Sequence, residues 1–293
     1  MMRRYTLTGC LLSLLLLCPS AHGLQDDVLV PMDRSLELFE GSPESGMKPL
    51  TAAVGRVDVA TYPLWDGYHA WHGMVASDLA LVAFGPNVIW RTGLWAQTVA
   101  DQRNNISFRL VRLFYEFHSG ADIRLGSGVL RAQLVHRCSH GSDDAETGRI
   151  LIRNGLDLGY RWQERWGDLL LEIDTRAHIT LLGQNRDLTS HPRALVSTAA
   201  QVSYDLAGPL SLVAGAGLGL AVMAEGESSE YTIAEPARDI FFQWLPAATA
   251  GVRFTGQGLS LALMLHGQRI VDSGVGLNSD PTTIYALRFI YDW

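Results

Sequence analysis

Hydrophobic and polar residues alternate along most of this chain from about residue 70 onward. In the segment "WGDLLLEIDTRAHIT", residues 166–180, one set of alternate positions is apolar and the other is mostly charged. The apolar set is Leu169, Leu171, Ile173, Thr175, Ala177 and Ile179, and the other set is Asp168, Leu170, Glu172, Asp174, Arg176 and His178. A period of two residues predicts a β-strand with one apolar face and one polar face. The same alternation is found in residues 148–162, 194–206 and 257–268.

The alternating segments are long, and turn-forming residues separate them. We expect about twelve strands, within a range of roughly ten to fourteen. Their approximate spans are 51–62, 70–84, 87–99, 105–119, 125–138, 147–163, 166–180, 193–206, 209–224, 241–255, 257–269 and 281–293. Such segments exceed the five or six residues usual in soluble sheets, whereas a tilted membrane strand needs about nine to eleven. Tight turns are expected near residues 85, 121, 164, 207 and 255, and they alternate with longer polar connections.

The first 50 residues of the chain lack this alternation, and the last nine residues continue it. Residues 1–23 combine Arg3 and Arg4 with an apolar run and a small-residue ending, which predicts a secretory signal peptide. Residues 24–50 are acidic and contain prolines and glycines, so we expect a flexible or plug-like N-terminal segment on the periplasmic side. The chain ends in "YALRFIYDW", which resembles the C-terminal signal strand of bacterial outer-membrane proteins and implies contact with the outer-membrane assembly machinery.

Alternation alone does not decide which face of the strands is buried, because a soluble sandwich would also alternate. Aromatic residues gather at strand ends, as with Tyr160 and Trp162, and Cys138 is the only cysteine beyond the signal peptide, so no intrachain disulfide is expected. We therefore predict an all-β fold, a transmembrane antiparallel up-and-down β-barrel over residues 51–293. Its apolar faces would contact lipid and lipopolysaccharide in the outer membrane of a Gram-negative cell.

Composition narrows the function of such a barrel. Acidic residues exceed basic ones, 30 against 23, and no basic run exists, so nucleic-acid binding is excluded. The inner wall is expected to carry Arg131, Arg137, Arg149, Arg153, Asp157, Arg161, Asp168, Glu172, Asp174, Arg176 and His178. These charges are explained either by an ion-pair network filling a narrow barrel or by a charged, porin-like channel for small solutes.

One stretch, "LVHRCSHGSDDAETGRILIRN" from 134 to 154, concentrates chemically active side chains. The candidate catalytic residues are Ser142, His140, Asn154, His136 and Ser139. His140, Ser142 and Asn154 resemble the His-x-Ser motif and following Asn of the outer-membrane phospholipase A family. That resemblance implies a twelve-stranded barrel with a site near the outer leaflet, in which the histidine activates the serine and the asparagine orients the imidazole. It also implies calcium, for which Asp143, Asp144 and Glu146 offer hard oxygen ligands.

The same stretch is also similar to an H-x-S-S-H type sequence in an uncharacterised family of outer-membrane barrels, from which no activity follows. A divalent-metal site formed by His136, His140 and the neighbouring acids, or a polar loop that cross-links lipopolysaccharide through divalent ions, would also explain these residues. The leading hypothesis is therefore a non-enzymatic barrel or a narrow channel for small solutes. The alternative is a phospholipase-like outer-membrane esterase.

Overall fold

A computed structural model describes residues 36–39, 41–63, 70–101, 109–141, 150–185, 190–225, 230–234, 238–271 and 281–293. The elements are the 3-10 helix η1 (Glu37–Phe39) and the strands β1 (Met47–Thr61), β2 (Trp71–Phe84), β3 (Val88–Asp101), β4 (Arg109–Leu125), β5 (Gly128–Gly141), β6 (Ile150–Trp166), β7 (Leu169–Asn185), β8 (Ser190–Ala207), β9 (Leu210–Glu225), β10 (Glu230–Thr232), β11 (Arg238–Trp244), β12 (Ala247–Gly256), β13 (Leu259–Val271) and β14 (Pro281–Asp292). Within these ranges, no helix is long and apolar enough to cross a membrane.

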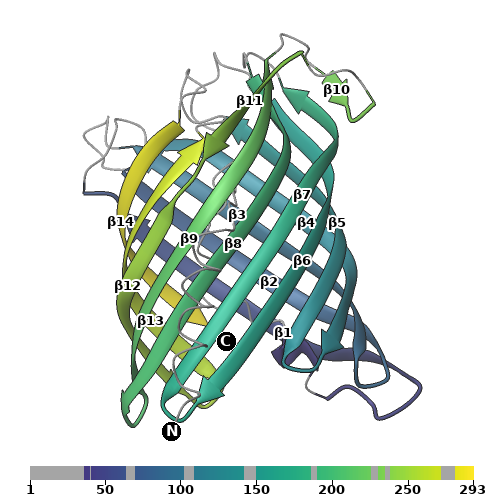
Figure 1. The fold of residues 1–293 in the computed structure, drawn as a ribbon, viewed down its shortest axis with the longest axis vertical. Helices are drawn as coiled ribbons and strands as arrows, with labels where there is room; N and C mark the ends of the chain where they lie inside the picture. Colours follow the sequence, from purple (N-terminus) through teal and green to yellow (C-terminus); the bar gives the residue numbers. More distant parts are fainter. Residues whose placement is uncertain are drawn as a thin grey trace, which may run out of the picture.

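The strands form one closed antiparallel barrel (Figure 1). Each of β1 to β8 pairs with the next strand along the chain, as do β12 and β13, and β14 pairs with β1 to close the cylinder. Both β11 and β12 pair with β9, so these two segments together occupy one strand position of the barrel wall, which is interrupted at Leu245 and Pro246. Each such strand position is called a stave below. The short β10 only extends the rim by pairing with β7. The barrel therefore has twelve staves, as the alternation predicted.

The period of two sorts side chains between the inside and the outside of the barrel. Along β14, Tyr285, Leu287 and Phe289 are exposed on the outer surface, whereas Ala286 and Arg288 are buried inside. Closure pairs the backbone groups of the wall across neighbouring strands, apart from local bulges, and such pairing is the condition for crossing hydrocarbon with strands. The predicted fold class, an all-β up-and-down transmembrane barrel, is confirmed.

Short turns lie at one end of the barrel, the lower end in Figure 1, where the C-terminus also lies. The two-residue turns are Gly126–Ser127, Gly167–Asp168, Gly208–Pro209 and Gln257–Gly258. Gly167 has φ +60°, a conformation that a two-residue hairpin requires and that glycine adopts without strain. Short turns are periplasmic in outer-membrane barrels, so the opposite end faces outward from the cell.

Two predicted turn positions are wrong. Residues 120–122 lie inside β4, and residues 164–165 lie inside β6, so the turns come several residues later. Gly120 is a glycine because a Cβ there would lie 2.2 Å from the carbonyl oxygen of Ala132 on β5. Its lack of a side chain therefore serves a close approach between strands, which looks the same as a turn signal in the sequence. Asp168, expected on the inner wall, is exposed in a turn.

The first and last strands meet at Gly55 and Trp293. The Gly55 amide donates to the Trp293 carbonyl at 2.9 Å, and the Trp293 amide donates back to Gly55 at 3.1 Å. The indole lies over Gly55, because a Cβ on this glycine would come within 2.2 Å of the ring. The C-terminal residue thus completes the seam that closes the barrel.

We predict that Gly55→Ala weakens this seam and lowers the free energy of unfolding by about 1–3 kcal/mol, since the new methyl group displaces the indole. Urea unfolding of the barrel in lipid vesicles, followed by tryptophan fluorescence, measures the change. Gly256→Ala is the matched control, because no atom lies within 4 Å of its added Cβ. Equal stability of the two variants would show that the indole moves aside without cost.

Candidate functional site on the lipid-facing wall

The outer surface of the barrel is an apolar belt. Exposed residues near the short turns include Phe84, Trp90, Trp166, Phe254 and Trp293. Towards the opposite rim, the exposed aromatic residues include Phe117, Phe242 and Tyr285. Aromatic girdles at both ends of an apolar band are typical of outer-membrane barrels, where they lie at the two lipid–water interfaces. The belt therefore contacts lipid, and polar side chains within it require an explanation.

His136 is such a side chain. It lies on β5 two residues beyond Leu134 and four beyond Ala132, and all three are exposed on the outer surface. The outward direction follows from strand alternation, because Val135 and Gln133 between them are buried inside. An imidazole in this position loses hydrogen bonds to water unless the wall supplies a partner.

The partner is Asn154 on β6. The strand register places the two residues directly opposite one another, and His136 Nδ1 lies 2.8 Å from Asn154 Oδ1. With the amide oxygen as acceptor, Nδ1–H donates, and Nε2 remains as the basic nitrogen of the ring. The pair therefore has the geometry of a base held by an orienting group.

The local backbone presents this pair among apolar side chains. In register with it are Phe117 on β4 and Leu182 on β7, both exposed on the outer surface. The β6–β7 pairing carries a bulge beside Asn154, where Leu181 is the extra residue. The bulge leaves Leu181 and Leu182 both exposed, and bulges often re-aim side chains next to functional sites.

The other predicted site residues lie near the end of β5 or outside the described part of the chain. Along the backbone, His140 pairs with Leu113 and Ile150, and Ser139 pairs with Phe114 and Leu151. Asn154 therefore lies opposite His136, four residues along β5 from His140. The residues that lie outside the described part of the chain are Ser142, Asp143, Asp144 and Glu146. Among the residues with a described position, no group of three or more His, Cys, Asp or Glu could hold a metal ion.

Cys138 joins this face of β5. Its thiol is free and partly exposed, and it lies two residues beyond His136 in the strand. Tyr115 and Ile152 are its partners in register. The sequence contained the signal for this placement, because Cys138 continues the alternate positions that begin at Leu130.

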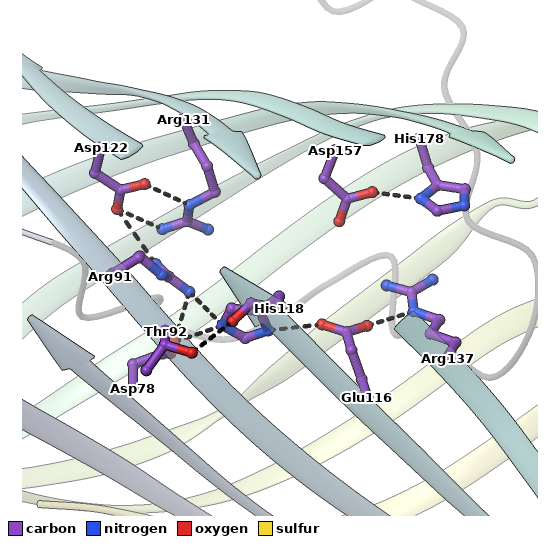
Figure 2. Close-up of polar contacts among 10 residues, drawn as sticks. All are labelled: Asp78, Arg91, Thr92, Glu116, His118, Asp122, Arg131, Arg137, Asp157 and His178. Atoms are coloured by element: carbon purple, nitrogen blue, oxygen red, sulfur yellow. Dashed lines mark hydrogen bonds and ion pairs between the residues drawn. The ribbon is translucent and has the colours of Figure 1, made fainter. Parts of the chain in front are cut away.

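The inner wall carries a second polar feature, a network across β2 to β5 (Figure 2). Arg91 donates to Asp78 at 2.7 Å and to Asp122 at 3.3 Å, and Arg131 donates twice to Asp122 at 3.1 and 3.2 Å. Asp122 is completely buried. One carboxylate therefore accepts from two guanidinium groups on two neighbouring staves.

A histidine continues the network towards the outer rim. His118 Nε2 lies 2.7 Å from Asp78 Oδ1, and His118 Nδ1 lies 2.9 Å from Glu116 Oε1 (Figure 2). Glu116 also accepts from Arg137. Gly93 leaves the space for the first contact, because a Cβ there would come within 2.2 Å of both Asp78 and His118. The inner wall predicted from the sequence did not contain Asp78, Glu116 or His118, although they follow the same alternation.

Similar pairs join β6 with β7 and β14 with β1. They are Asp157 with His178, Arg161 with Glu172, Arg56 with Asp292, and Arg288 with Asp58. Each of these pairs joins two adjacent staves. Of the predicted inner-wall residues, Arg149 lies outside the described residues, and Arg131, Arg153, Arg161, Glu172 and His178 are buried. These ion pairs form bridges between adjacent staves on the inner wall.

No family model matches the chain, and no curated protein matches it in sequence. Solved structures that it resembles include an outer membrane phospholipase (OMPLA) dimer with bound calcium from Salmonella typhi, at 12% identity and TM-score 0.41, over 87% of this chain and 95% of that one. The NanC porin resembles it at 11% identity and TM-score 0.44, over 83% and 99% of the two chains. The KdgM porin does so at 10% identity and TM-score 0.39, over 82% and 98%.

The membrane position of the chain follows from its own architecture. A closed antiparallel barrel with an apolar outer belt, aromatic ends and a charged interior is the strand-built solution for crossing a bilayer. The protein is therefore an outer-membrane β-barrel in contact with membrane lipid.

Proposed function

We propose that the barrel hydrolyses lipid esters at its outer surface, with His136 and Asn154 as part of the catalytic site. The observation that carries this proposal is the 2.8 Å contact between His136 and Asn154 on the lipid-facing wall. A purely structural wall gains nothing from an imidazole and an amide in hydrocarbon, since both groups are better solvated in water. A base held by an orienting amide beside acyl chains has a direct use in ester hydrolysis.

The proposed reaction is acyl transfer through a serine. His140, two residues before Ser142 in the sequence, or His136, which contacts Asn154, takes the hydroxyl proton as the serine oxygen attacks the ester carbonyl carbon. The bond between that carbon and the alcohol oxygen then breaks, and the departing oxygen receives the proton from the same histidine. Water hydrolyses the resulting acyl-serine by the same route, which releases the fatty acid and restores the serine.

The nucleophile is proposed to be Ser142, with Ser139 as the other candidate. His140 is the nearer base for Ser142 along the chain, because the extended β5 places Gly141 about 16 Å from His136. The acidic residues Asp143, Asp144 and Glu146 are the proposed calcium ligands, because carboxylate oxygens suit that ion. Calcium would place positive charge near the oxyanion that forms during attack.

We predict that the mature protein in detergent hydrolyses a fluorescent phospholipid, and that Ser142→Ala lowers the rate about 10³-fold or more. If Ser142 is the nucleophile, Ser139→Ala retains activity. If Ser139 is the nucleophile, Ser139→Ala loses activity and Ser142→Ala retains it. Chelation of calcium is expected to reduce the rate of the active protein. Equal trace release by the wild type and both alanine variants would refute the hydrolase.

A second candidate function is a narrow passage for small ionic solutes, which the charged inner wall favours. The bridges between Arg91, Asp122 and Arg131 run along neighbouring staves and line the interior. Such a wall would solvate a small ion in transit. Contacts with lipopolysaccharide at the outer rim, and with the assembly machinery through β14, are further proposals that the barrel architecture supports.

A further inference from the structure

The inner wall changes character at the periplasmic end. Ile89 and Val129, close to two of the short turns, are buried and apolar, and Ala80 and Ala83 lie beside them. A bulge between Ala80 and Val82 makes Leu81 the extra residue of β2, so Ala80 and Ala83 both face inward. These four residues, Ala80, Ala83, Ile89 and Val129, form an apolar ring segment of the interior, called the collar below, on the periplasmic side of the charged network.

Residues from the N-terminal segment occupy this collar. Leu38 and Phe39 of η1 are 0% and 3% exposed and pack against the four collar residues. Leu36 packs against the same cluster. Because the collar residues face the lumen, η1 lies inside the periplasmic mouth of the barrel.

Polar contacts also hold the segment in place. The guanidinium carbon of Arg124 lies 4.7 Å from the centre of the Phe39 ring, and its Nη2 donates to the Leu36 carbonyl at 3.2 Å. Below η1, Lys48 donates to the Gly41 carbonyl at 3.0 Å, and the Gly85 amide donates to Gly46 at 2.9 Å. Together with the packing of Leu36, Leu38 and Phe39 against the collar, these contacts hold η1 in the mouth of the barrel.

We propose that residues 36–39 are a removable stopper, which closes the periplasmic mouth when Leu38 and Phe39 occupy the collar. Passage of small ions through the lumen requires the stopper to leave. This proposal rests on the second candidate function, the narrow passage, and is independent of the hydrolase. The stopper joins β1 through residues 41–46, which are exposed or half-buried and leave it a tether on which to move.

Single-channel recording in planar bilayers with potassium chloride tests the stopper. Phe39→Asp places a carboxylate in the apolar collar and is expected to raise the open fraction at least tenfold over the wild type. Ser45→Asp adds the same charge to an exposed position of the same segment and is expected to leave the open fraction unchanged. Heat-modifiable gel mobility confirms that each variant forms a barrel.

A disulfide lock supplies the second measurement. In a Cys138→Ser background, Leu38→Cys and Val129→Cys join residues of the same buried cluster. Oxidation is expected to abolish channel openings, and a reductant to restore them. Openings that are equal in the oxidised and reduced forms would overturn the stopper and leave the passage intact. Silence of every variant, Phe39→Asp included, would overturn the stopper and the passage together.

Discussion

Replacing His136 with alanine is expected to lower phospholipid hydrolysis about 10³-fold or more, with the barrel still folded. The imidazole is a proposed base, with His140 as the alternative, and without its base the serine hydroxyl keeps its proton during attack. Asn154→Ala is expected to cost less, roughly 10- to 100-fold, because a neutral amide orients the ring without stabilising its charge as a carboxylate would. Initial rates on a fluorescent phospholipid in detergent measure both effects.

A matched control exists on the same outer surface. Thr175 and Thr198 form an outward-facing hydrogen bond of 3.0 Å across β7 and β8. Thr175→Ala therefore removes a lipid-facing polar contact without touching the proposed site, and its rate should equal that of the wild type. Partial rescue of His136→Ala by free imidazole would separate lost chemistry from lost packing. A His136→Ala rate equal to the Thr175→Ala rate would exclude His136 as the base.

The second large effect is expected inside the wall. Asp122→Asn removes the charge that Arg91 and Arg131 both contact, while it keeps the shape of the side chain. Because Asp122 is completely buried, two guanidinium groups lose a carboxylate where water is scarce. The free energy of unfolding is expected to fall by about 3–5 kcal/mol, measured by urea titration in lipid vesicles.

The exposed pair of Arg165 and Asp205 provides the comparison for Asp122. Its two side chains lie 2.7 Å apart and are 52% and 39% exposed, so Asp205→Asn should change stability by at most about 1 kcal/mol. The double variant Asp122→Leu with Arg131→Leu should be closer to the wild type than Asp122→Asn is. Equal losses in Asp122→Asn and Asp205→Asn would mean that the lumen solvates its charges as well as bulk water does.

Alternation in the sequence predicted which way side chains face, because one physical rule governs every strand of a closed wall. The alternate positions of β5 and β6 that carry apolar residues also include His136 and Asn154, and the structure has both on the outer face. The alternation could not predict their partnership. The register between β5 and β6 depends on the length and conformation of the connection between them, which leave no clear mark in the hydrophobic pattern. The spacing of His140 and Asn154 pointed to a different partner for the asparagine.

Turn positions and the N-terminal segment were harder to predict from the sequence for another reason. Gly120 allows close contact with the Ala132 backbone, whereas Gly167 forms a hairpin turn. The residue type alone does not distinguish these two roles. The placement of η1 depends on a collar assembled from β2, β3 and β5. Such a surface exists only after distant strands have come together, so composition could suggest a plug-like segment but not where it binds.

The bridges between staves constrain how this barrel enters a membrane. A hairpin of β3 and β4 would carry Arg91 and Asp122, but Asp78 and Arg131 belong to the staves on either side. Hairpins that cross the bilayer one at a time would thus expose ionised groups to acyl chains until their neighbours arrive. Insertion is therefore expected to be concerted, with the sheet curling while its concave side still holds water.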